Sequence, residues 1–491
     1  MNRTIATSRN YYWLHTLIYF LLTFGIGKIS YSALPPMGMS VIGIFLGLLY
    51  GWTFIGFIWP SMFSIFMLGV CGFFPSPQDA FAHAFSQQLV VFMLLVLVFT
   101  AYCEQSGLNK KMSCWFLSRK MLVGHPWIFT FMVLLGSFVV SFLVDGNAVV
   151  FLVWNLMYSI FDEVGYKKGE PYPAFVLAGA AIAAILSFGC KPWGNVCILA
   201  IGALESATGG AYTVDYLTFM AVTVPICILF VTAYFLVMKY VFRPDVSKLM
   251  NLSDEYLARM RSELKLSLHE KTAALALLVF MLLMILPTFL SGEKGIAGFF
   301  GSFNFLSAVA IVLIALTLIK VEGKPLLDFD ACARSGIHWH VFWITAAALP
   351  VSAAVSSEGA GITQWLGMLM NEYFQDTNVF VFLVLFSVIV NLATQLTHNV
   401  SLVLIAVPVA VQVSSSLGLN PLALTVLVVI AAACAYATPA ASTVAAILFS
   451  NVDWIGVKNS FKAGFSAVIA GLIVLFVCGF PIIGAVYGFF L

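Results

Sequence analysis

The sequence predicts an all-α membrane protein that crosses the bilayer many times. Of its 491 residues, 62% are hydrophobic and only 9% are charged, and the mean hydropathy is +1.03. Soluble domains carry about 25% charged residues, so most of this chain is expected to avoid water. Apolar blocks recur along the chain at about the 20 residues that a spanning helix needs. We therefore predict about 11 transmembrane helices and two re-entrant hairpins.

The composition also excludes several classes of protein. A net charge of +2 without a basic, aromatic cluster gives no reason to expect nucleic acid as a partner. The nine cysteines are scattered through apolar blocks without a CxxC pair, which is typical of small buried hydrophobes. We expect no metal centre and no cofactor beyond a coupling ion. Arg3 and Arg9 precede an apolar stretch without a cleavage site, so that stretch is predicted to be the first span rather than a signal peptide.

The N-terminal region, residues 1–36, is predicted to hold one helix, at about 13–29. The first half of the remaining chain, residues 37–241, begins with three ordinary spans. A stretch at 108–124 then mixes lysines with aromatic residues, which is typical of a helix lying in the membrane interface. A charged loop at 242–271 separates this half from the second.

Two long apolar blocks of the first half are interrupted by polar or helix-breaking residues. The block at 127–161 would be about 52 Å long as one helix, against a hydrocarbon core of roughly 30 Å, and it is too short to cross twice. A re-entrant hairpin with a polar tip at Asp145-Gly146-Asn147 meets both limits. The block at 174–205 contains Pro192 among glycines, which predicts a helix broken in mid-membrane.

The second half, residues 272–491, repeats this order. Three spans and another interfacial arm, at 360–374, precede a second hairpin at 378–417, whose tip holds His398 and Asn399. A second broken helix at 422–450 is interrupted near Pro439, and a final span follows. An odd number of spans in each half predicts that the two halves are related by inversion.

The distribution of positive charge supports this topology. If the N-terminus is cytoplasmic and each hairpin returns to its own side, all but three of the 23 lysines and arginines lie in cytoplasmic segments. The exceptions are Lys28, Lys191 and Lys294, of which Lys191 lies within the membrane. We predict a multi-pass protein of the inner or plasma membrane with a cytoplasmic N-terminus.

Inverted repeats with broken helices predict a binding site near the membrane midplane. The helix N-termini at the hairpin tips attract anions, and the carbonyl ends of broken helices coordinate cations. The sequence therefore indicates a secondary active transporter of small organic anions, such as carboxylates. The hairpins and broken helices would move against a scaffold of the other spans, which is an elevator mechanism, with lipid surrounding the scaffold.

At these interruptions the chain resembles the divalent anion:sodium symporter family. The segment 394–400 (TQLTHNV), followed by Pro408, is similar to the second hairpin tip of that family. The segment 437–439 (ATP) is similar to its partner turn, and 461–464 (FKAG) resembles the entry to the last helix. The resemblance implies dicarboxylate symport with sodium as coupling ion and a homodimer formed by the scaffold.

The resemblance also implies site residues. Substrate would contact both tips and both turns, through Asp145, Gly146, Asn147, Lys191, Pro192, His398, Asn399, Val400, Thr438 and Pro439. Cations would lie between Ser141, Asp145 and Gly189 in the first half, and between Thr394, Asn399 and Ala437 in the second. The first tip departs from the Ser-Asn-Thr signature of the family, and the first turn carries an additional lysine, Lys191.

Asp145 and Lys191 are the clear charges deep in the predicted spans, where each costs roughly 2.5–3.5 kcal/mol. Lys191 would supply positive charge to an anion site or replace the first sodium with Asp145 as its partner. Alternatively, the two form a structural salt bridge. His398 would take a coupling proton, or it stays neutral and hydrogen-bonded to backbone or substrate.

Four other functions fit the sequence less well. On the same fold, a proton- or cation-coupled antiporter would use Asp145 and His398 as titrating groups, and an anion exchanger would use Lys191 in place of one sodium. An enzyme is disfavoured because the chain has no HExxH, GxSxG or phosphate-loop motif. A channel is disfavoured because paired hairpins fit alternating access better.

Overall fold

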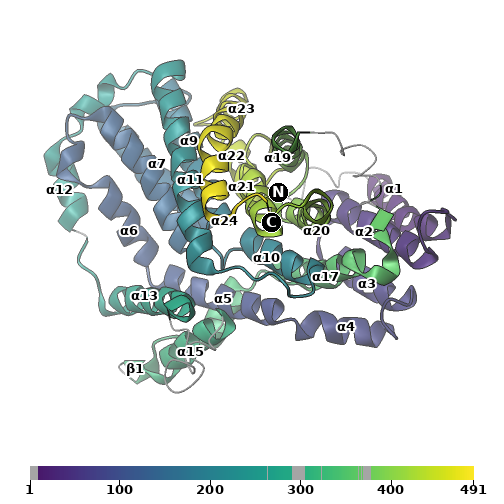
Figure 1. Ribbon diagram of the computed structural model, residues 1–491. Coiled ribbons are helices and arrows are strands. Elements are labelled where there is room, and N and C mark those ends of the chain that lie inside the picture. The colour runs from purple at the N-terminus through teal and green to yellow at the C-terminus, as the bar shows by residue number, and fades with distance from the viewer. Residues whose placement is uncertain are drawn as a thin grey trace.

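The computed structural model describes residues 9–262, 264–289, 305–321, 323–362, 364, 365, 368 and 378–490 (Figure 1). These residues are almost all helical; the strands among them are β1 (Lys320–Val321) and β2 (Lys324–Pro325), which pair antiparallel. Ten helices of this described part are long and apolar enough to cross a membrane. The all-α, polytopic membrane class is therefore confirmed.

These ten helices are not the same set as the predicted spans, because the prediction of about 11 counted membrane crossings and not single helices. The ten include hairpin helices such as Asn399–Leu417 and the first part of the first broken helix, Pro171–Gly189, but they leave out the shorter parts of the broken helices. Asn195–Ala207 and Pro421–Ala433 have 13 residues each. A 13-residue helix is about 20 Å long, which is less than the hydrocarbon core.

The first half begins with helices that match the predicted spans and one helix that the hydropathy pattern missed. That helix, α4, is short and polar; Ser76 caps it by accepting a hydrogen bond from the backbone N–H of Asp79 at 3.2 Å. The helices here are α1 (Arg9–Phe20), α2 (Pro36–Phe54), α3 (Ile58–Val70), α4 (Pro77–Ser86), α5 (Gln88–Gln105), α6 (Leu108–Leu117), α7 (Pro126–Leu143), α8 (Gly146–Val164), α9 (Pro171–Leu186), α10 (Asn195–Ala207) and α11 (Tyr216–Val237).

The charged loop that follows α11 is itself partly helical, because it contains α12. Of the predicted second arm, 360–374, most residues lie outside the described part. The remaining helices are α12 (Asp254–Ser262), α13 (Leu268–Phe289), α15 (Phe305–Leu318), α16 (Phe329–Gly336), α17 (Trp339–Ser356), α19 (Val379–Leu396), α20 (Asn399–Leu417), α21 (Pro421–Ala433), α22 (Thr443–Ser450), α23 (Val457–Val474) and α24 (Phe480–Tyr487).

Helices α9 and α21 form the buried centre. Within Pro171–Gly189, 94% of the residues are buried, against 33% within Leu268–Leu286. Helix α9 lies beside α7, α8, α11 and α23, and Figure 1 shows α7, α9 and α11 side by side. Small residues on α9 allow this close approach: a Cβ on Gly179 would lie 2.5 Å from the ring of Tyr234. Alanine and glycine thus set how closely the central helices pack.

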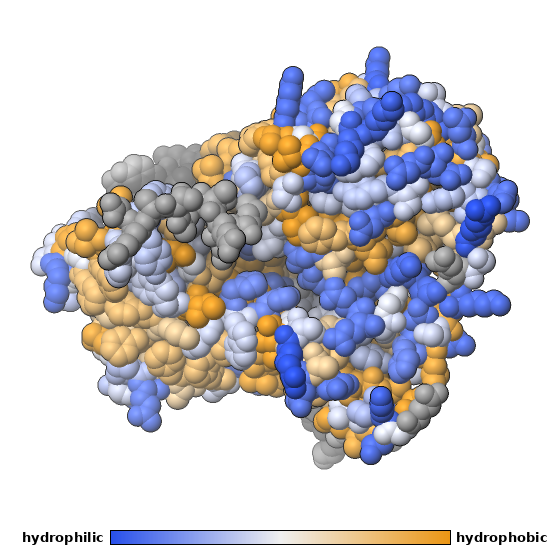
Figure 2. Space-filling model, turned by 180° about the vertical axis from the view of Figure 1, so that it is seen from behind, coloured by the Kyte–Doolittle hydropathy of each residue, from blue (hydrophilic) through white to orange (hydrophobic). Residues whose placement is uncertain are grey.

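The outer helices present apolar side chains to the exterior. Figure 2 shows broad hydrophobic areas on one face, most continuous at the left, with hydrophilic side chains over the centre and much of the right side. Large side chains with more than half of their surface exposed include Leu282, Ile314, Ile389, Ile469 and Ile473. A face of this kind suits hydrocarbon rather than water.

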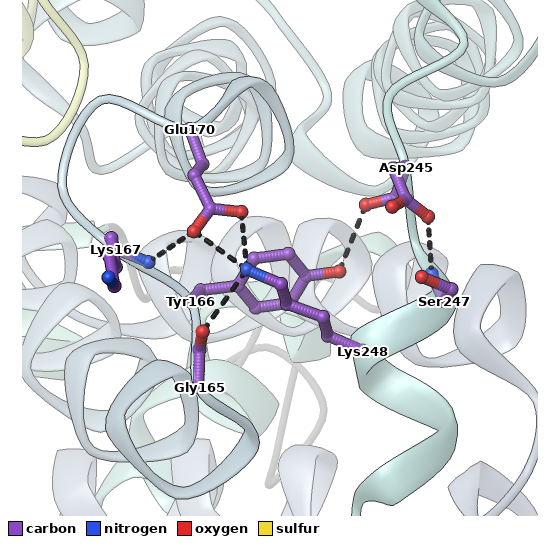
Figure 3. Close-up of polar contacts among 7 residues, drawn as sticks. All are labelled: Gly165, Tyr166, Lys167, Glu170, Asp245, Ser247 and Lys248. Carbon is purple, nitrogen blue, oxygen red and sulfur yellow. Dashed lines mark hydrogen bonds and ion pairs between the residues drawn. The ribbon is translucent and has the colours of Figure 1, made fainter.

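A cluster of polar contacts joins the loop between α8 and α9 to the chain after α11 (Figure 3). The Lys248 ammonium donates to both carboxylate oxygens of Glu170 at 2.8 Å and to the Gly165 carbonyl at 3.1 Å. The Tyr166 hydroxyl donates to the backbone carbonyl of Asp245 at 3.0 Å. The cluster thereby fixes the start of the connection that leads to α12 and α13.

We predict that Glu170→Gln lowers the melting temperature at neutral pH and has little effect in acid. The hydrogen bond from Lys248, with one from the backbone N–H of Lys167, holds the pKa of Glu170 below its usual value. A lowered pKa contributes stability that is present at neutral pH and lost as the pH falls through it. The melting temperatures of wild type and variant should therefore begin to converge only as the pH falls below the ordinary pKa of a glutamate, about 4.3.

The control for this prediction is Asp453→Asn. It removes the ion pair of Asp453 with Lys168, at 2.9 Å, in which both side chains are more than half exposed. Exposed pairs contribute little, so this variant should melt close to wild type. A constant difference between Glu170→Gln and wild type across the pH range would contradict the role of the ion pair.

Candidate functional site

The first hairpin tip joins α7 to α8 through Val144 and Asp145. The Asp145 carboxylate caps α8, accepting hydrogen bonds from the backbone N–H groups of Asn147 at 2.9 Å and Ala148 at 3.3 Å. Gly146 lies against the ring of Phe188, which a Cβ at this position would approach to 2.8 Å. The Asp145 carboxylate thus caps the N-terminus of α8, where a negative charge is favourable.

The second tip joins α19 to α20 through Thr397 and His398. The side-chain oxygen of Asn399 accepts a hydrogen bond from the backbone N–H of Val400 at 2.9 Å, and Nδ1 of His398 accepts from the same group at 3.4 Å. Accepting a hydrogen bond requires a lone pair on Nδ1, which favours the unprotonated ring. The Asn399 side chain is 2% exposed, and its Nδ2 has no partner in the described part of the chain.

The two broken helices are interrupted by turns of the same kind. In the first, the N–H of Gly194 donates to the Lys191 carbonyl at 2.9 Å, and Pro192 is the second residue of the turn. In the second, the N–H of Ala441 donates to the Thr438 carbonyl at 3.2 Å, with Pro439 in the same place. Proline fixes φ at a value that suits this position of a turn and cannot continue the helical hydrogen bonds.

Lys191 connects the first turn to the first tip. Its side chain is buried, and its ammonium donates to the backbone carbonyls of Ser141 at 2.9 Å and Val144 at 3.0 Å. Ion pairs between described residues do not include Lys191, so the predicted salt bridge with Asp145 is not formed. The ammonium instead satisfies carbonyls at the C-terminal end of α7, where the helix leaves them unpaired.

Gln395 connects the second tip to the second turn. Its amide nitrogen donates to the carbonyls of Cys434 at 2.7 Å and Asn391 at 2.9 Å, and its oxygen accepts from the N–H of Ala437 at 2.9 Å. The Thr438 hydroxyl donates to the Gln395 carbonyl. This residue was not among the predicted site residues. The sequence feature that could have identified Gln395 is an amide side chain within an apolar span, because a buried amide needs hydrogen-bond partners.

Hydrogen bonds also link elements of different halves. The Thr443 hydroxyl, at the start of α22, donates to the Asn147 side-chain oxygen at 2.9 Å. Helix α22 lies against α8, and α10 lies against α20. At the centre, a Cβ on Gly189 would lie 2.4 Å from the Cβ of Ala433, so the ends of the two interrupted helices touch.

All the predicted site residues lie at this junction of tips and turns. Asn399 is bonded there through its backbone N–H to the Ala441 carbonyl at 3.0 Å, and Thr394 through its hydroxyl to the Ala432 carbonyl at 3.2 Å. Ser141 is fully buried there, and its hydroxyl has no partner among described residues. Sequence reasoning did not select Ala441 and Thr443, because their partners, Asn399 and Asn147, come from other parts of the chain.

A family model described as a citrate transporter, CitMHS, matches residues 47–429. This chain belongs to the CitMHS family. The predicted resemblance to an anion-transporter family is thus confirmed, and this CitMHS family member is a transporter rather than an enzyme. The predicted multi-pass membrane character agrees with the family and with the apolar helices.

Curated relatives of this CitMHS protein are similar at low identity. An uncharacterized transporter of Synechocystis is 28% identical over 27% of this chain and 23% of its own length. Two proteins named sodium-dependent dicarboxylate transporter SdcS also match. That of Staphylococcus saprophyticus is 21% identical over 71% of this chain and 68% of its own. That of Staphylococcus aureus is 23% identical over 54% and 51%. The match thus spans about a quarter, two thirds and half of these relatives.

Two solved structures share the fold. The YdaH transporter of Alcanivorax borkumensis superimposes with a TM-score of 0.58 at 16% identity, over 96% of this chain and 98% of that one. MtrF of Neisseria gonorrhoeae, from a class of antimetabolite efflux pumps, gives 0.57 at 15% identity, over 82% and 83%. At these identities the likeness concerns the architecture of the CitMHS chain and not its substrate.

Proposed function

We propose that this protein is a secondary active transporter of small organic anions, with di- and tricarboxylates as the substrate class. The substrate is bound between the two hairpin tips and the two proline turns and is coupled to sodium or a proton. The protein resides in the inner or plasma membrane with a cytoplasmic N-terminus. Sodium-dependent dicarboxylate transporters among its relatives support this choice of substrate and ion.

The observation that carries the proposal is the meeting of helix N-termini at one place. The Asn147–Thr443 hydrogen bond joins the N-termini of α8 and α22, and the Asn399–Ala441 bond brings the N-terminus of α20 to the same turn. The N-terminus of a helix carries a partial positive charge, so the convergence of these N-termini favours a carboxylate, with Asp145 already capping α8 and Ser442 capping α22. The unpartnered Nδ2 of Asn399 is a donor available to such a ligand.

The two halves are proposed to be inverted repeats, residues 37–241 and 272–491. The two proline turns match each other. In addition, a helix of each half packs against a hairpin helix of the other half, α22 against α8 and α10 against α20. Both observations support this relation. The hairpins, 127–161 and 378–417, and the broken helices, 174–205 and 422–450, would move together as an elevator. The remaining spans would form a scaffold embedded in lipid and paired in a homodimer.

We expect the purified protein to be stabilised by di- or tricarboxylates in thermal unfolding, and Asn399→Ala to lose this effect. The substitution removes this buried donor together with the side-chain oxygen that accepts from the N–H of Val400. A substrate hydrogen bond to such a group contributes about 1–3 kcal/mol, so affinity should fall roughly 10- to 100-fold. Asn147→Ala should weaken binding as well, because it breaks the link to Thr443.

Asn155→Ala is the matched control. It lies on α8, as Asn147 does, but its side chain is exposed. It should bind carboxylates as wild type does. If a cation or a change of pH stabilises the protein and no carboxylate does, the proposal is contradicted. The remaining hypothesis is then the proton- or cation-coupled antiporter, with Asp145 and His398 as titrating groups.

A further inference from the structure

The surroundings of Lys191 resemble those of a bound cation. Its ammonium is held by two backbone carbonyls, Ser141 at 2.9 Å and Val144 at 3.0 Å, and lies 4.9 Å from the centre of the Phe188 ring. The residue is only 6% exposed. Carbonyl oxygens at a helix C-terminus and an aromatic face both stabilise positive charge.

The side chain fills a space shaped for it. A Cβ on Gly194 would lie 2.7 Å from Cγ of Lys191 and 3.0 Å from its Cε. A larger residue at 194 would therefore displace the lysine. The turn that carries Pro192 directs the side chain back toward the end of α7, so its position is set by the backbone and not by a carboxylate partner.

The corresponding carbonyl of the second half receives a neutral donor. Near the end of α19, the Gln395 carbonyl accepts a hydrogen bond from the hydroxyl of Thr438, the residue before Pro439, just as Lys191 is the residue before Pro192. The hydroxyl fills this hydrogen-bonding position without adding charge. A buried ammonium at the end of the hairpin helix therefore distinguishes the first half from the second.

We infer that the Lys191 ammonium is a tethered cation that occupies the first cation position, so that transport requires no free ion there. The inference rests on the proposed function, because it concerns the charge balance of the same anion site. An ammonium and an alkali cation carry the same charge and are both stabilised by carbonyl oxygens. Lys191 forms no ion pair within the described residues, and the nearby Asp145 carboxylate, whose charge acts on this ammonium, is instead hydrogen-bonded to the first N–H groups of α8.

The test compares Lys191→Ala with Lys191→Met in thermal unfolding without any organic anion. The alanine variant leaves room for a cation between the α7 carbonyls, whereas methionine fills the space with an uncharged chain. Titration with sodium or n-propylammonium chloride, against choline chloride at constant ionic strength, should stabilise Lys191→Ala beyond wild type. The same titration should not rescue Lys191→Met. Lys168→Ala, at an exposed lysine, is the control and should respond as wild type does.

Indifference of Lys191→Ala to both cations would overturn the inference. A second measurement uses the wild type alone: the sodium dependence of carboxylate binding should have a Hill coefficient of at most about one. A coefficient near two would also overturn it. If no carboxylate binds to wild type, the proposed function fails, and the titration without anion still decides the role of Lys191.

Discussion

Replacing Gln395 by leucine is expected to abolish carboxylate binding and to lower the melting temperature strongly. Leucine fills a similar volume but leaves the N–H of Ala437 without its acceptor and the Cys434 carbonyl without its closest donor. Each buried backbone group that loses its partner costs about 1–3 kcal/mol. The second turn would therefore lose its position relative to α19. Thermal unfolding with and without carboxylate measures both effects.

Gln412→Leu is the control for this prediction. Gln412 lies on α20, in the same hairpin, but is half-buried and away from the turn. It should unfold near the wild-type temperature and retain carboxylate stabilisation. Wild-type binding by Gln395→Leu would show that the amide only fills space between α19 and the turn.

Gly464→Ala is expected to have the second large effect, through the packing of α23 against the second turn. An added Cβ would lie 2.7 Å from both the Cα of Ala437 and the carbonyl oxygen of Tyr436. These are backbone atoms, so the turn or the helix has to shift. Overpacking of this kind costs about 1–3 kcal/mol, and affinity should fall about tenfold or more because the displaced turn belongs to the site.

Gly471→Ala, on the same helix, provides the comparison. Its Cβ would meet the Tyr436 hydroxyl at 3.3 Å and the Cys434 sulfur at 3.6 Å, and both are ends of side chains. Alanine also favours helix over glycine by about 1 kcal/mol, so this variant should be as stable as wild type or more so. Equal melting temperatures and affinities for both alanine variants would contradict the tight contact at Gly464.

The positions at which the spans are interrupted follow from local chemistry. Pro192 and Pro439 each stand in a turn, because proline cannot donate the hydrogen bond that a helix interior requires. Asp145 and His398 begin α8 and α20 as helix caps, which polar side chains favour. These features depend on residues that are neighbours in sequence, so they were visible in the sequence.

The partners of the polar side chains were not visible in this way. Lys191 was expected to supply charge to an anion site, to replace a sodium with Asp145 as its partner, or to form a structural salt bridge with Asp145. No such salt bridge forms between described residues, and the ammonium bonds to the carbonyls of Ser141 and Val144. Asp145 instead satisfies the first N–H groups of α8. Both outcomes follow from the need of helix ends to satisfy unpaired backbone groups in an apolar interior.

The sequence by itself determined that this chain is an all-α membrane protein, where its long apolar blocks break, and which residues stand at the breaks. Hydropathy, proline and glycine act over a few residues, and a membrane requires every spanning segment to satisfy its own backbone. Only the tertiary structure decided that Thr443 meets Asn147 and that Gln395 bridges Cys434 and Ala437. Such contacts join residues about 40 to 300 positions apart, and they depend on how whole helices pack, which no local pattern encodes.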